Sequence, residues 1–578
     1  MNQRFAKLGR HFISKGAISF AFVGLLFSSG VSASVDIKNG NMIMSYVDLF
    51  YTGGFEPIIR RVYNSKSNQN KGSFGWGWGY EYETYLSAFP DGTLVVHEFG
   101  SGADNRFTPP NFSDSQIAES VRAISTIASK SGLIAGGPVL EDYKRKLKNS
   151  SSFRDLEWQK LRKKYPKLAL AELKPIAEGA QFQSLEFSYQ YITKKGSEFI
   201  RKHDTGKTQV FYDFSEANDS VGGRLKKVYD KNGNFIEFKY KDGNLEKLVD
   251  NFNRKIFFTF NNKGLISKLE GENGKATSYT YNDSAELTLS KDASANIYAY
   301  EYDKQKRHNL EKISYRDKST YKVDYYGRDK FENVKRVTDR TGTVTDYDYP
   351  KLPDGVAAII KTLSSGKVIS TEQYEYHEKT KPSGDKWTSK LVAIVDKDRT
   401  DTDYDEKCLL PEKITRGKQF TSFTYDLKCR VVKKVTQNDI TTLAYHPTAG
   451  KVSQVAKSLT GPKPKDLGWS KFDYDAKANL IFAENSERKK VTLAYDANGR
   501  IKTMLDQDKR QISFEYNEDS KPIKITDPSL GSISVEYDNK GEIKKVDSPA
   551  GRKIAVQVTT AFQNLLDIIR PAGVTLSF

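Results

Sequence analysis

Short runs of alternating apolar and polar residues, separated by turn-forming residues, dominate the chain from about residue 200 onward. After Gly223, a short strand is predicted over 225–228, a turn over 230–234 and an alternating strand over 235–240. A period of two is typical of half-buried strands, and an Asn-Gly turn between two such strands predicts a β-hairpin. The pattern returns at Ile501 to Tyr516, Ile523 to Tyr537 and Ile543 to Val558, which predicts consecutive hairpins.

An aromatic residue followed by a turn recurs at nearly constant intervals through this region. Most spacings are 20, 21 or 23 residues. A fixed period in this range predicts stacked supersecondary units rather than one globular core. The positions are Tyr240, Phe260, Tyr281, Tyr302, Tyr326, Tyr349, Tyr376, Tyr404, Tyr425, Tyr445, Tyr474, Tyr495, Tyr516 and Tyr537.

The amino-acid composition favours β structure and leaves room for many such units. The chain has 578 residues, and its 33 Tyr and 32 Phe far outnumber its Trp, Met and Cys. Single cores stop growing near about 250–300 residues, so several domains or one long array are expected. Aromatic residues of this kind are enriched in strands.

The first 33 residues differ from the rest and are typical of a secretory signal peptide. Four basic residues precede an apolar run over 17–27, and small residues lead to a predicted cleavage between Ala33 and Ser34. The run is shorter than the roughly 20 residues that a bilayer needs, which disfavours an uncleaved anchor. Cleavage would lower the formal net charge from +18 to +14, and no later segment is apolar enough to span a membrane.

A helical pattern interrupts the β pattern over residues 113–180. Ser113 and Gln116 form a predicted capping box, and Ile117, Val121 and Ile124 follow at helical spacing. Two basic helical stretches follow, around 141–148 and 153–165. Arg162, Lys163 and Lys164 form a small basic patch, which suits either an anionic polymer or a solvated helix face.

Two seven-residue segments of the repeat region carry a family resemblance. Residues 495–501 read Tyr-Asp-Ala-Asn-Gly-Arg-Ile and residues 537–543 read Tyr-Asp-Asn-Lys-Gly-Glu-Ile. They resemble the YD repeat of Rhs and related wall-associated and toxin-complex proteins, over roughly residues 200–578. The repeat-motif residues are Tyr240, Tyr281, Tyr302, Tyr425, Asp426, Tyr495, Asp496, Gly499, Tyr516, Tyr537, Asp538 and Gly541.

The mature N-terminus is similar to the domain that precedes the repeats in many Rhs proteins. The similarity lies in residues 35–41, 48–49, 57–65 and 72–78. Trp76 and Trp78 alternate with glycine, which predicts a tight strand with both rings on one face. The rings suit either a buried cap for the first hairpin or a sugar-stacking platform, and capping is favoured because a repeat stack must cover its open end.

Candidate chemistry is sparse. The five histidines of the mature chain are scattered without metal-ligand spacing, and we predict no metal site, no cofactor and no catalytic residue. The acidic stretch 396–406 is the best calcium candidate, but Asp401, Asp403 and Asp405 alternate as on an ordinary solvated strand. We predict that the chain is not an enzyme. A polysaccharide-cleaving alternative needs two paired carboxylates, which the sequence does not single out.

Cys408 and Cys429 each lie four residues after a repeat tyrosine. An oxidising compartment favours a disulfide between them. Equivalent strand positions in neighbouring hairpins, however, are about 9.5 Å apart, beyond the roughly 7 Å limit between Cα atoms. The disulfide therefore requires a bend between the two units.

The predicted architecture is mainly β: tandem YD hairpins forming a twisted spiral or partial-shell sheet, with a helical insertion near the N-terminus. We expect a signal peptide over 1–33, an Rhs-like β domain over 34–112, the helical insertion over 113–180 and the repeat array over 181–578. Toxin-carrying proteins of this family have a self-cleavage segment and a toxin after the repeats, and the resemblance does not include these parts. The chain ends in a repeat-like unit.

These features are compatible with two functions. The preferred one is an exported, non-enzymatic envelope or surface protein, in the periplasm, on the cell surface or secreted, that binds an anionic glycan or wall polymer, or a protein partner. Its net charge of +14 after cleavage favours an anionic partner, and export disfavours nucleic acid. The alternative is an Rhs-type shell fragment that shields or delivers a separately encoded toxin or effector.

Overall fold

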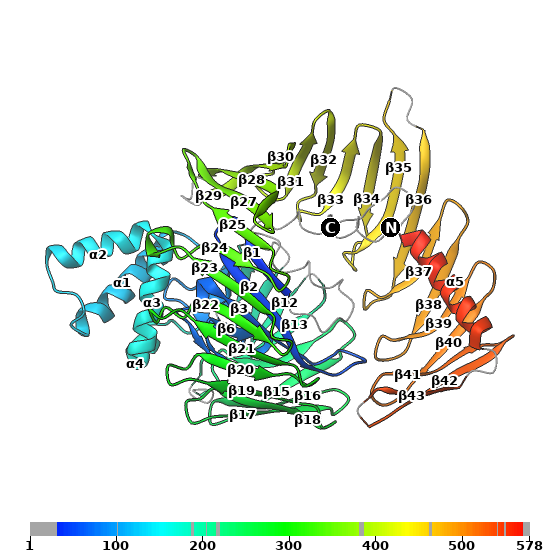
Figure 1. The fold of residues 1–578 in the computed structure, drawn as a ribbon, viewed down its shortest axis with the longest axis horizontal. Helices are drawn as coiled ribbons and strands as arrows, with labels where there is room; N and C mark the ends of the chain where they lie inside the picture. Colours follow the sequence, from blue (N-terminus) through cyan, green and yellow to red (C-terminus); the bar gives the residue numbers. More distant parts are fainter. Residues whose placement is uncertain are drawn as a thin grey trace. The chain divides into compact units, whose positions relative to one another are not determined.

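The computed structural model describes residues 32–100, 102–185, 190–203, 205–215, 220–380, 386–461, 465–539, 541–547 and 551–569. The described chain is mainly β, as predicted (Figure 1). Its large antiparallel sheet has 37 strands and is not closed as a whole. It divides into two compact units, which are described separately: one comprises Met1–Trp78, Lys231–Asn234 and Leu248–Phe578, the other Gly79–Asp230 and Phe235–Lys247.

The second unit contains a small ring of eight antiparallel strands. Successive strands pair along the chain, Tyr85 bridges to Arg224, and the amide of Leu86 donates to the carbonyl of Gly223, which joins the first strand to the last. The strands are β7 (Tyr85–Ala88), β8 (Leu94–Glu98), β9 (Ala103–Thr108), β10 (Gln181–Ser184), β11 (Tyr191–Lys195), β12 (Glu198–Lys202), β13 (Thr208–Tyr212) and β14 (Leu225–Tyr229), and β15 (Phe235–Lys241) pairs with β14.

A buried polar network accompanies the apolar side chains of this ring. Arg201 is 1% exposed, donates to Gln190 and Gln209, and forms an ion pair with Glu98. His203 also contacts Gln209, with 3.0 Å between Nε2 and Oε1. Burial, with a smaller contribution from the nearby Arg201, lowers the pKa of the His203 imidazole to about 3. This histidine is therefore neutral in the folded protein across the physiological range.

The buried neutral His203 predicts a pH-dependent stability. The unfolded chain takes up a proton as pH falls below about 6.5, whereas the folded chain does not until about pH 3. The free energy of unfolding should therefore fall on acidification, by up to about 2 kcal/mol between pH 7 and pH 5. Urea unfolding at both pH values measures the effect. His203→Gln should remove this part of the pH dependence, and an unchanged slope would contradict the assignment.

A layer of four helices packs on the ring, in agreement with the predicted helical insertion. The helices are α1 (Asp114–Lys130), α2 (Pro138–Asn149), α3 (Ser151–Lys164) and α4 (Pro166–Ala171). The predicted capping box of Ser113 and Gln116 is present at the start of α1. A single apolar core joins the helices to Phe89 and Val95 of the ring, and the fully buried Trp158 donates from its indole N–H to the carbonyl of Ala88 at 3.0 Å.

The first unit begins with a small sheet in the order β1-β2-β3-β6 and continues into the repeat array. The bounds of the small sheet are β1 (Ser32–Asp36), β2 (Asn41–Phe50), β3 (Ile58–Asn64) and β6 (Trp78–Tyr80), with a hairpin of β4 (Lys71–Gly72) and β5 (Gly75–Trp76). Residues 1–31 of the predicted signal peptide lie outside the described residues. The predicted cleavage junction between Ala33 and Ser34 falls within β1.

The repeat array consists of hairpins whose strands pair in chain order. Its strands are β16 (Asn244–Asp250), β17 (Lys255–Phe260), β18 (Ile266–Gly271), β19 (Ala276–Tyr281), β20 (Leu287–Lys291), β21 (Ile297–Tyr302), β22 (Leu310–Tyr315), β23 (Thr320–Tyr325), β24 (Val334–Thr338), β25 (Val344–Asp348), β26 (Lys351–Leu352), β27 (Gly355–Ser364), β28 (Lys367–Thr380), β29 (Lys386–Val395), β30 (Asp398–Tyr404), β31 (Pro411–Arg416), β32 (Gln419–Tyr425), β33 (Val431–Thr436), β34 (Asp439–Tyr445), β35 (Val452–Leu459), β36 (Asp466–Tyr474), β37 (Leu480–Asn485), β38 (Lys490–Tyr495), β39 (Ile501–Asp506), β40 (Gln511–Tyr516), β41 (Pro522–Asp527), β42 (Gly531–Tyr537) and β43 (Ile543–Asp547).

The Tyr-Asp motif has a structural role that explains its recurrence. The Asp496 carboxylate accepts from the amides of Asn498 and Arg500, which closes the turn, and an ion pair with Arg500 adds to it. The Tyr495 hydroxyl donates to the carbonyl of Leu480, at the start of the preceding strand, at 2.8 Å. The same donation to the strand before is made by Tyr240, Tyr281, Tyr425, Tyr445, Tyr474, Tyr516 and Tyr537. In one unit the prediction is wrong by one residue: Tyr325 donates to the strand before, whereas the hydroxyl of the predicted Tyr326 donates to the carbonyl of Tyr347.

Removing one motif hydroxyl should have a small, local effect. Tyr495→Phe loses one half-buried hydrogen bond and leaves the Leu480 carbonyl without this donor, so we expect the free energy of unfolding to fall by about 1 kcal/mol. Urea titration measures it. Tyr229→Phe, a tyrosine outside the repeat-motif set, is the comparison. Equal effects in the two variants would contradict a special role for the motif hydroxyl.

The array returns onto itself within the first unit, as a spiral requires. The amide of Asn479 donates to the side chain of Asn232 at 2.9 Å, and the amide of Asn234 donates to the carbonyl of Asn498 at 2.8 Å. Gly499 has a φ of +75°, and a Cβ there would lie 2.1 Å from the Asn232 side chain. This motif glycine is therefore required both by the turn and by the close approach of an earlier turn.

The last predicted hairpin is wrong. Strand β43 forms as expected, but the segment predicted as its partner, up to Val558, belongs to helix α5 (Gly551–Ile569). Ile554, Ala561, Leu565 and Ile568 recur at spacings of seven, four and three residues and are buried on one side of the helix. Burial of this apolar stripe against a face of the sheet outweighs the strand preference of the β-branched residues in the segment.

Candidate functional site

Helix α5 lies along the apolar face of the last hairpins and defines the candidate site. It contacts β37, β38, β39 and β42 (Figure 1). The buried core beneath it contains Val491, Leu493, Met504 and Ile512, with Ala561, Leu565 and Ile568 supplied by the helix. We call this surface of the sheet the helix-covered face.

Polar contacts fix the helix at the edge of this apolar core. Lys489 forms an ion pair with Asp567 at 2.8 Å, and the buried amide of Asn564 donates to the Asp506 carboxylate at 3.1 Å. Asp506 is also the turn aspartate that pairs with Arg510. The arrangement can therefore hold an amphipathic helix in a defined orientation through an apolar stripe and two flanking polar anchors.

The helix-covered face continues beyond α5 with a different chemistry. In the strand register, the same face includes Ser470, Val455 and Leu443, and then Thr441 and Lys434. On β30 to β32 it presents Thr402, Ile414, Thr421 and Phe423 in the same way. The face is thus apolar under α5 and mixed, with hydroxyl and cationic side chains, farther along the array.

Trp76 and Trp78, predicted to share one face of a single strand, lie on different strands and in different environments. Trp76, on β5, stacks on His308 with 4.5 Å between ring centroids and donates to the carbonyl of Ser284 at 2.8 Å. Trp78, on β6, is 2% exposed and donates to the Tyr302 hydroxyl at 2.8 Å. Both rings contact the repeat array. Trp78 has no ring surface available to a sugar.

A buried ion pair joins the N-terminal sheet to the array beside Trp78. Arg61 is 0% exposed, and its Nε lies 2.9 Å from Oδ2 of Asp48. Its guanidinium also contacts the hydroxyls of Tyr300 and Ser290. The rings of Tyr46, Phe74, Trp78, Tyr279 and Tyr300 surround it at 4.5 to 5.8 Å. Sequence reasoning missed this cluster because Tyr279, Ser290 and Tyr300 lie more than 200 residues from Arg61 in the sequence.

Cys408 and Cys429 form a disulfide, with Cα atoms 5.4 Å apart. The spacing of about 9.5 Å expected from strand geometry does not apply, because both residues lie in turns rather than in strands. Cys408 lies between β30 and β31, and Cys429 lies between β32 and β33. Turns can approach one another more closely than the strands that they join.

The disulfide should contribute measurably to stability. Closing a loop with a sequence separation of 21 residues predicts that Cys408→Ser with Cys429→Ser lowers the free energy of unfolding by about 3 kcal/mol. Urea unfolding of the double variant measures the loss. The unsubstituted protein treated with a reductant should lose a similar amount, and a reductant effect on the double variant itself would contradict the assignment.

Two carboxylates of the acidic stretch suggested as a calcium candidate are paired with cations. Asp401 pairs with Arg399 and Lys390, and Asp398 pairs with Arg416. The hydrogen bond from Arg399, with a smaller contribution from Lys390, lowers the pKa of the Asp401 carboxyl to about 2. Among the described residues, no group of three or more His, Cys, Asp or Glu side chains is arranged to hold a metal ion.

Three side chains of the ring have the bonding order of a hydrolytic triad, which sequence reasoning did not find. His97 contacts Asp104 at 2.7 Å through Nδ1 and Ser87 at 3.1 Å through Nε2. Ser87 and His97 are 3% and 2% exposed, and Arg162 of α3 donates to the same hydroxyl. A nucleophile must reach its substrate. This covered serine instead serves to join β7 to the helical layer.

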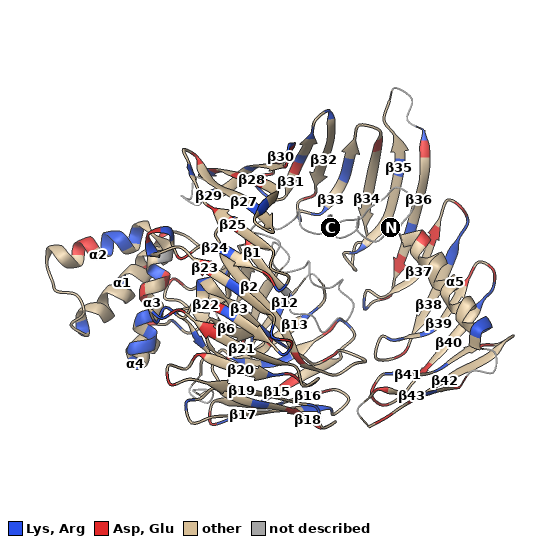
Figure 2. Ribbon diagram, in the orientation of Figure 1, with Lys and Arg blue, Asp and Glu red and all other residues tan. Residues whose placement is uncertain are grey.

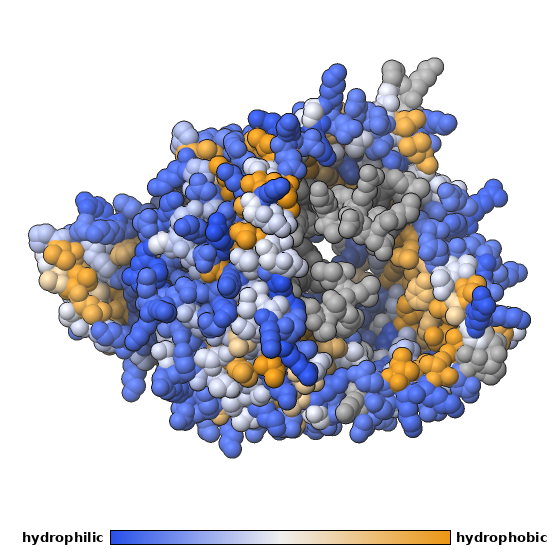
Figure 3. All heavy atoms as spheres, in the orientation of Figure 1, coloured by the Kyte–Doolittle hydropathy of each residue, from blue (hydrophilic) through white to orange (hydrophobic). Residues whose placement is uncertain are grey.

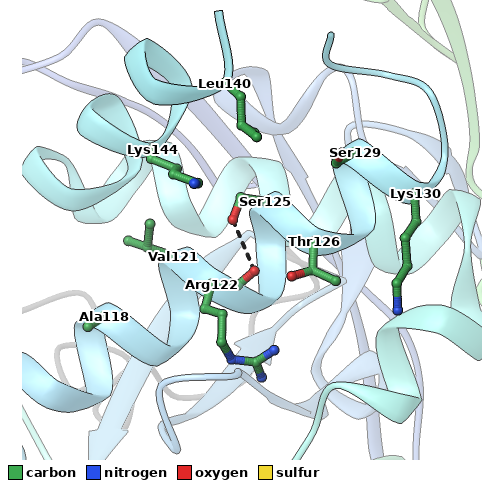
Figure 4. A pocket seen from close by; sticks show the side chains of 9 residues that line it. All are labelled: Ala118, Val121, Arg122, Ser125, Thr126, Ser129, Lys130, Leu140 and Lys144. Atoms are coloured by element: carbon green, nitrogen blue, oxygen red, sulfur yellow. Dashed lines mark hydrogen bonds between the residues drawn. The ribbon is translucent and has the colours of Figure 1, made fainter. Parts of the chain in front are cut away.

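The groove between α1 and α2 is a second surface feature of the second unit (Figure 4). Ala118, Val121 and Ser125 form its floor on α1, and Leu140 and Lys144 approach it from α2. Lys130 and Lys144 line it at opposite ends (Figure 4). No helix of the described chain is long and apolar enough to cross a bilayer.

Comparison with known proteins gives this architecture its family. The family model of the Teneurin YD-shell matches residues 179–578, more than half of the chain. The chain belongs to the Teneurin YD-shell family. A model of a domain of unknown function, DUF6531, matches residues 32–107 of this YD-shell protein. Residues 108–178, which contain the helical layer, lie between the two matches.

Solved structures similar to this YD-shell protein include toxin complexes. The crystal structure of TcdB2-TccC3-TEV is 12% identical over 89% of this chain, with a TM-score of 0.41. The Tc holotoxin pore of Photorhabdus luminescens is 11% identical over 89% of this chain, with a TM-score of 0.39. The chain spans 28% and 32% of those chains, respectively. No curated protein matches.

Proposed function

We propose that this YD-shell protein is an exported, non-enzymatic scaffold of the cell envelope or surface that binds a polypeptide partner on its helix-covered face. The observation that carries the proposal is α5 itself. An amphipathic helix buries Leu565 and Ile568 on this face, with Asp567 and Asn564 anchored beside them. A surface that holds one such helix has the chemistry to hold another.

The glycan-binding alternative has less support from the repeat tyrosines. Sugar stacking needs an exposed aromatic face. The rings of Tyr425, Tyr495 and Tyr516 are only partly accessible, and their hydroxyls donate to backbone carbonyls. Burial raises the pKa of the Tyr495 hydroxyl to about 12, in keeping with this structural role. The apolar face also suits the second candidate, a shell that shields a separately encoded toxin or effector.

A capture experiment with matched variants tests the proposal. The immobilised full chain is incubated with envelope and secreted fractions, beside a glycan and wall-polymer array, at low and physiological salt. We expect one polypeptide to be retained at both salt concentrations. Retention should rise severalfold in Leu565→Asp, which loosens α5 from a position that is 8% exposed. A salt-sensitive glycan signal without any retained polypeptide would overturn the proposal.

The control variant lies on the opposite side of the same helix. Val556 is 59% exposed, so Val556→Asp adds the same charge without disturbing the contact of α5 with the sheet. Retention should therefore equal that of the unsubstituted protein. A rise in both variants would show that negative charge on α5, rather than uncovering of the face, causes the capture.

A further inference from the structure

The helical layer carries a net positive charge. From Asp114 to Ala171 it contains twelve Lys and Arg against six Asp and Glu, a net charge of +6. Figure 2 shows these cations on α2, α3 and α4. The layer lies outside both family matches, so its surface chemistry is a property of this chain rather than of the shell.

An uncharged apolar tip projects from this basic layer, where α1 is joined to α2. The ten residues from Ser131 to Leu140 include no charged side chain. Leu133 is 45% exposed and Val139 is 55% exposed. Between them Ile134 packs against the core of the layer, which fixes the position of the tip. Figure 3 shows the resulting hydrophobic patch at the end of the α1–α2 hairpin.

Cations stand beside this tip. Lys130 lies in the last turn of α1 and Lys144 in the second turn of α2. Both line the groove between these two helices (Figure 4). Lys146 and Lys148 follow on α2, whose four basic residues outnumber its two acidic ones. The pairs of Lys144 with Glu141 and Lys146 with Asp142 are exposed, so they leave a net positive charge at the surface. Exposed apolar side chains with a collar of lysines match the two layers of an anionic bilayer surface, its acyl boundary and its headgroups.

We propose that the α1–α2 tip docks this protein on an anionic phospholipid bilayer surface. Leu133 and Val139 enter the headgroup–acyl boundary, while Lys130 and Lys144 contact lipid phosphates. An anionic polysaccharide would use the same lysines but would gain nothing from the leucine and the valine. The exposed apolar pair therefore favours lipid over polymer as the partner.

Vesicle co-sedimentation of the full chain tests the proposal. We expect binding to phosphatidylglycerol-containing vesicles, weaker binding at high salt, and little binding to pure phosphatidylcholine. Leu133→Ser with Val139→Ser should lower the partition coefficient about tenfold. Lys130→Gln and Lys144→Gln should each lower it about fivefold. Thermal unfolding should be unchanged, because all four positions are at the surface of the layer.

The matched controls lie in the repeat array. Leu427 is 84% exposed, so Leu427→Ser removes an exposed leucine elsewhere, and Lys418→Gln removes an exposed lysine. Neither should change vesicle binding. Equal losses in the control and tip variants would overturn the proposal. Binding to dextran sulfate without vesicle binding would replace lipid by an anionic polymer, and binding to neither probe would reject the tip as a docking surface.

Discussion

Replacing Arg61 by Leu is expected to lower the free energy of unfolding of the first unit by about 3–5 kcal/mol, the largest loss predicted for a single side chain of the N-terminal sheet. The substitution leaves the Asp48 carboxylate, 4% exposed, without its buried counter-ion. It also removes the cation that lies 4.5 Å from the Trp78 ring and 4.7 Å from the Tyr46 ring. Urea unfolding measured by near-UV circular dichroism reports both changes.

Two comparisons separate the buried charge from lost packing. Arg61→Leu with Asp48→Leu removes both charges and should recover part of the loss, since no unpaired ion then remains buried. Arg399→Leu breaks a surface pair with Asp401, in which Arg399 is 57% exposed, and should leave the unfolding midpoint unchanged. A double variant as unstable as Arg61→Leu would show that packing, rather than the ion pair, dominates.

The repeat array could be predicted from sequence because each motif is satisfied locally. Asp496 closes its own turn, and Tyr495 reaches only the strand before it, so the period of the motif carries the structure of every unit. The capping box at Ser113 is local in the same sense. Elements whose hydrogen bonds are satisfied within about 20 residues leave a readable pattern.

The failures concern partners that are distant in sequence. The stripe from Ile554 to Ile568 contains a helical period, but Val556 and Val558 also suit a strand, and the choice depends on a sheet face supplied by Val491 and Met504. The Arg61 cluster depends likewise on rings more than 200 residues away. Tertiary contacts outweigh local propensity in both cases.

The second large effect is expected at Trp158, which holds the helical layer to the ring. Trp158→Ala deletes a side chain that is 0% exposed and the indole donor to the Ala88 carbonyl, so the layer should lose about 3–5 kcal/mol. Because one apolar core joins all four helices, the loss should concentrate in them. Hydrogen exchange should quicken across α1 to α4 and stay slow in β12 and β13. Leu156→Ala, on the same helix at a position that is 50% exposed, is the control and should change neither. Equal loss of protection in the strands would instead show that the ring and its helical layer unfold as one cooperative body.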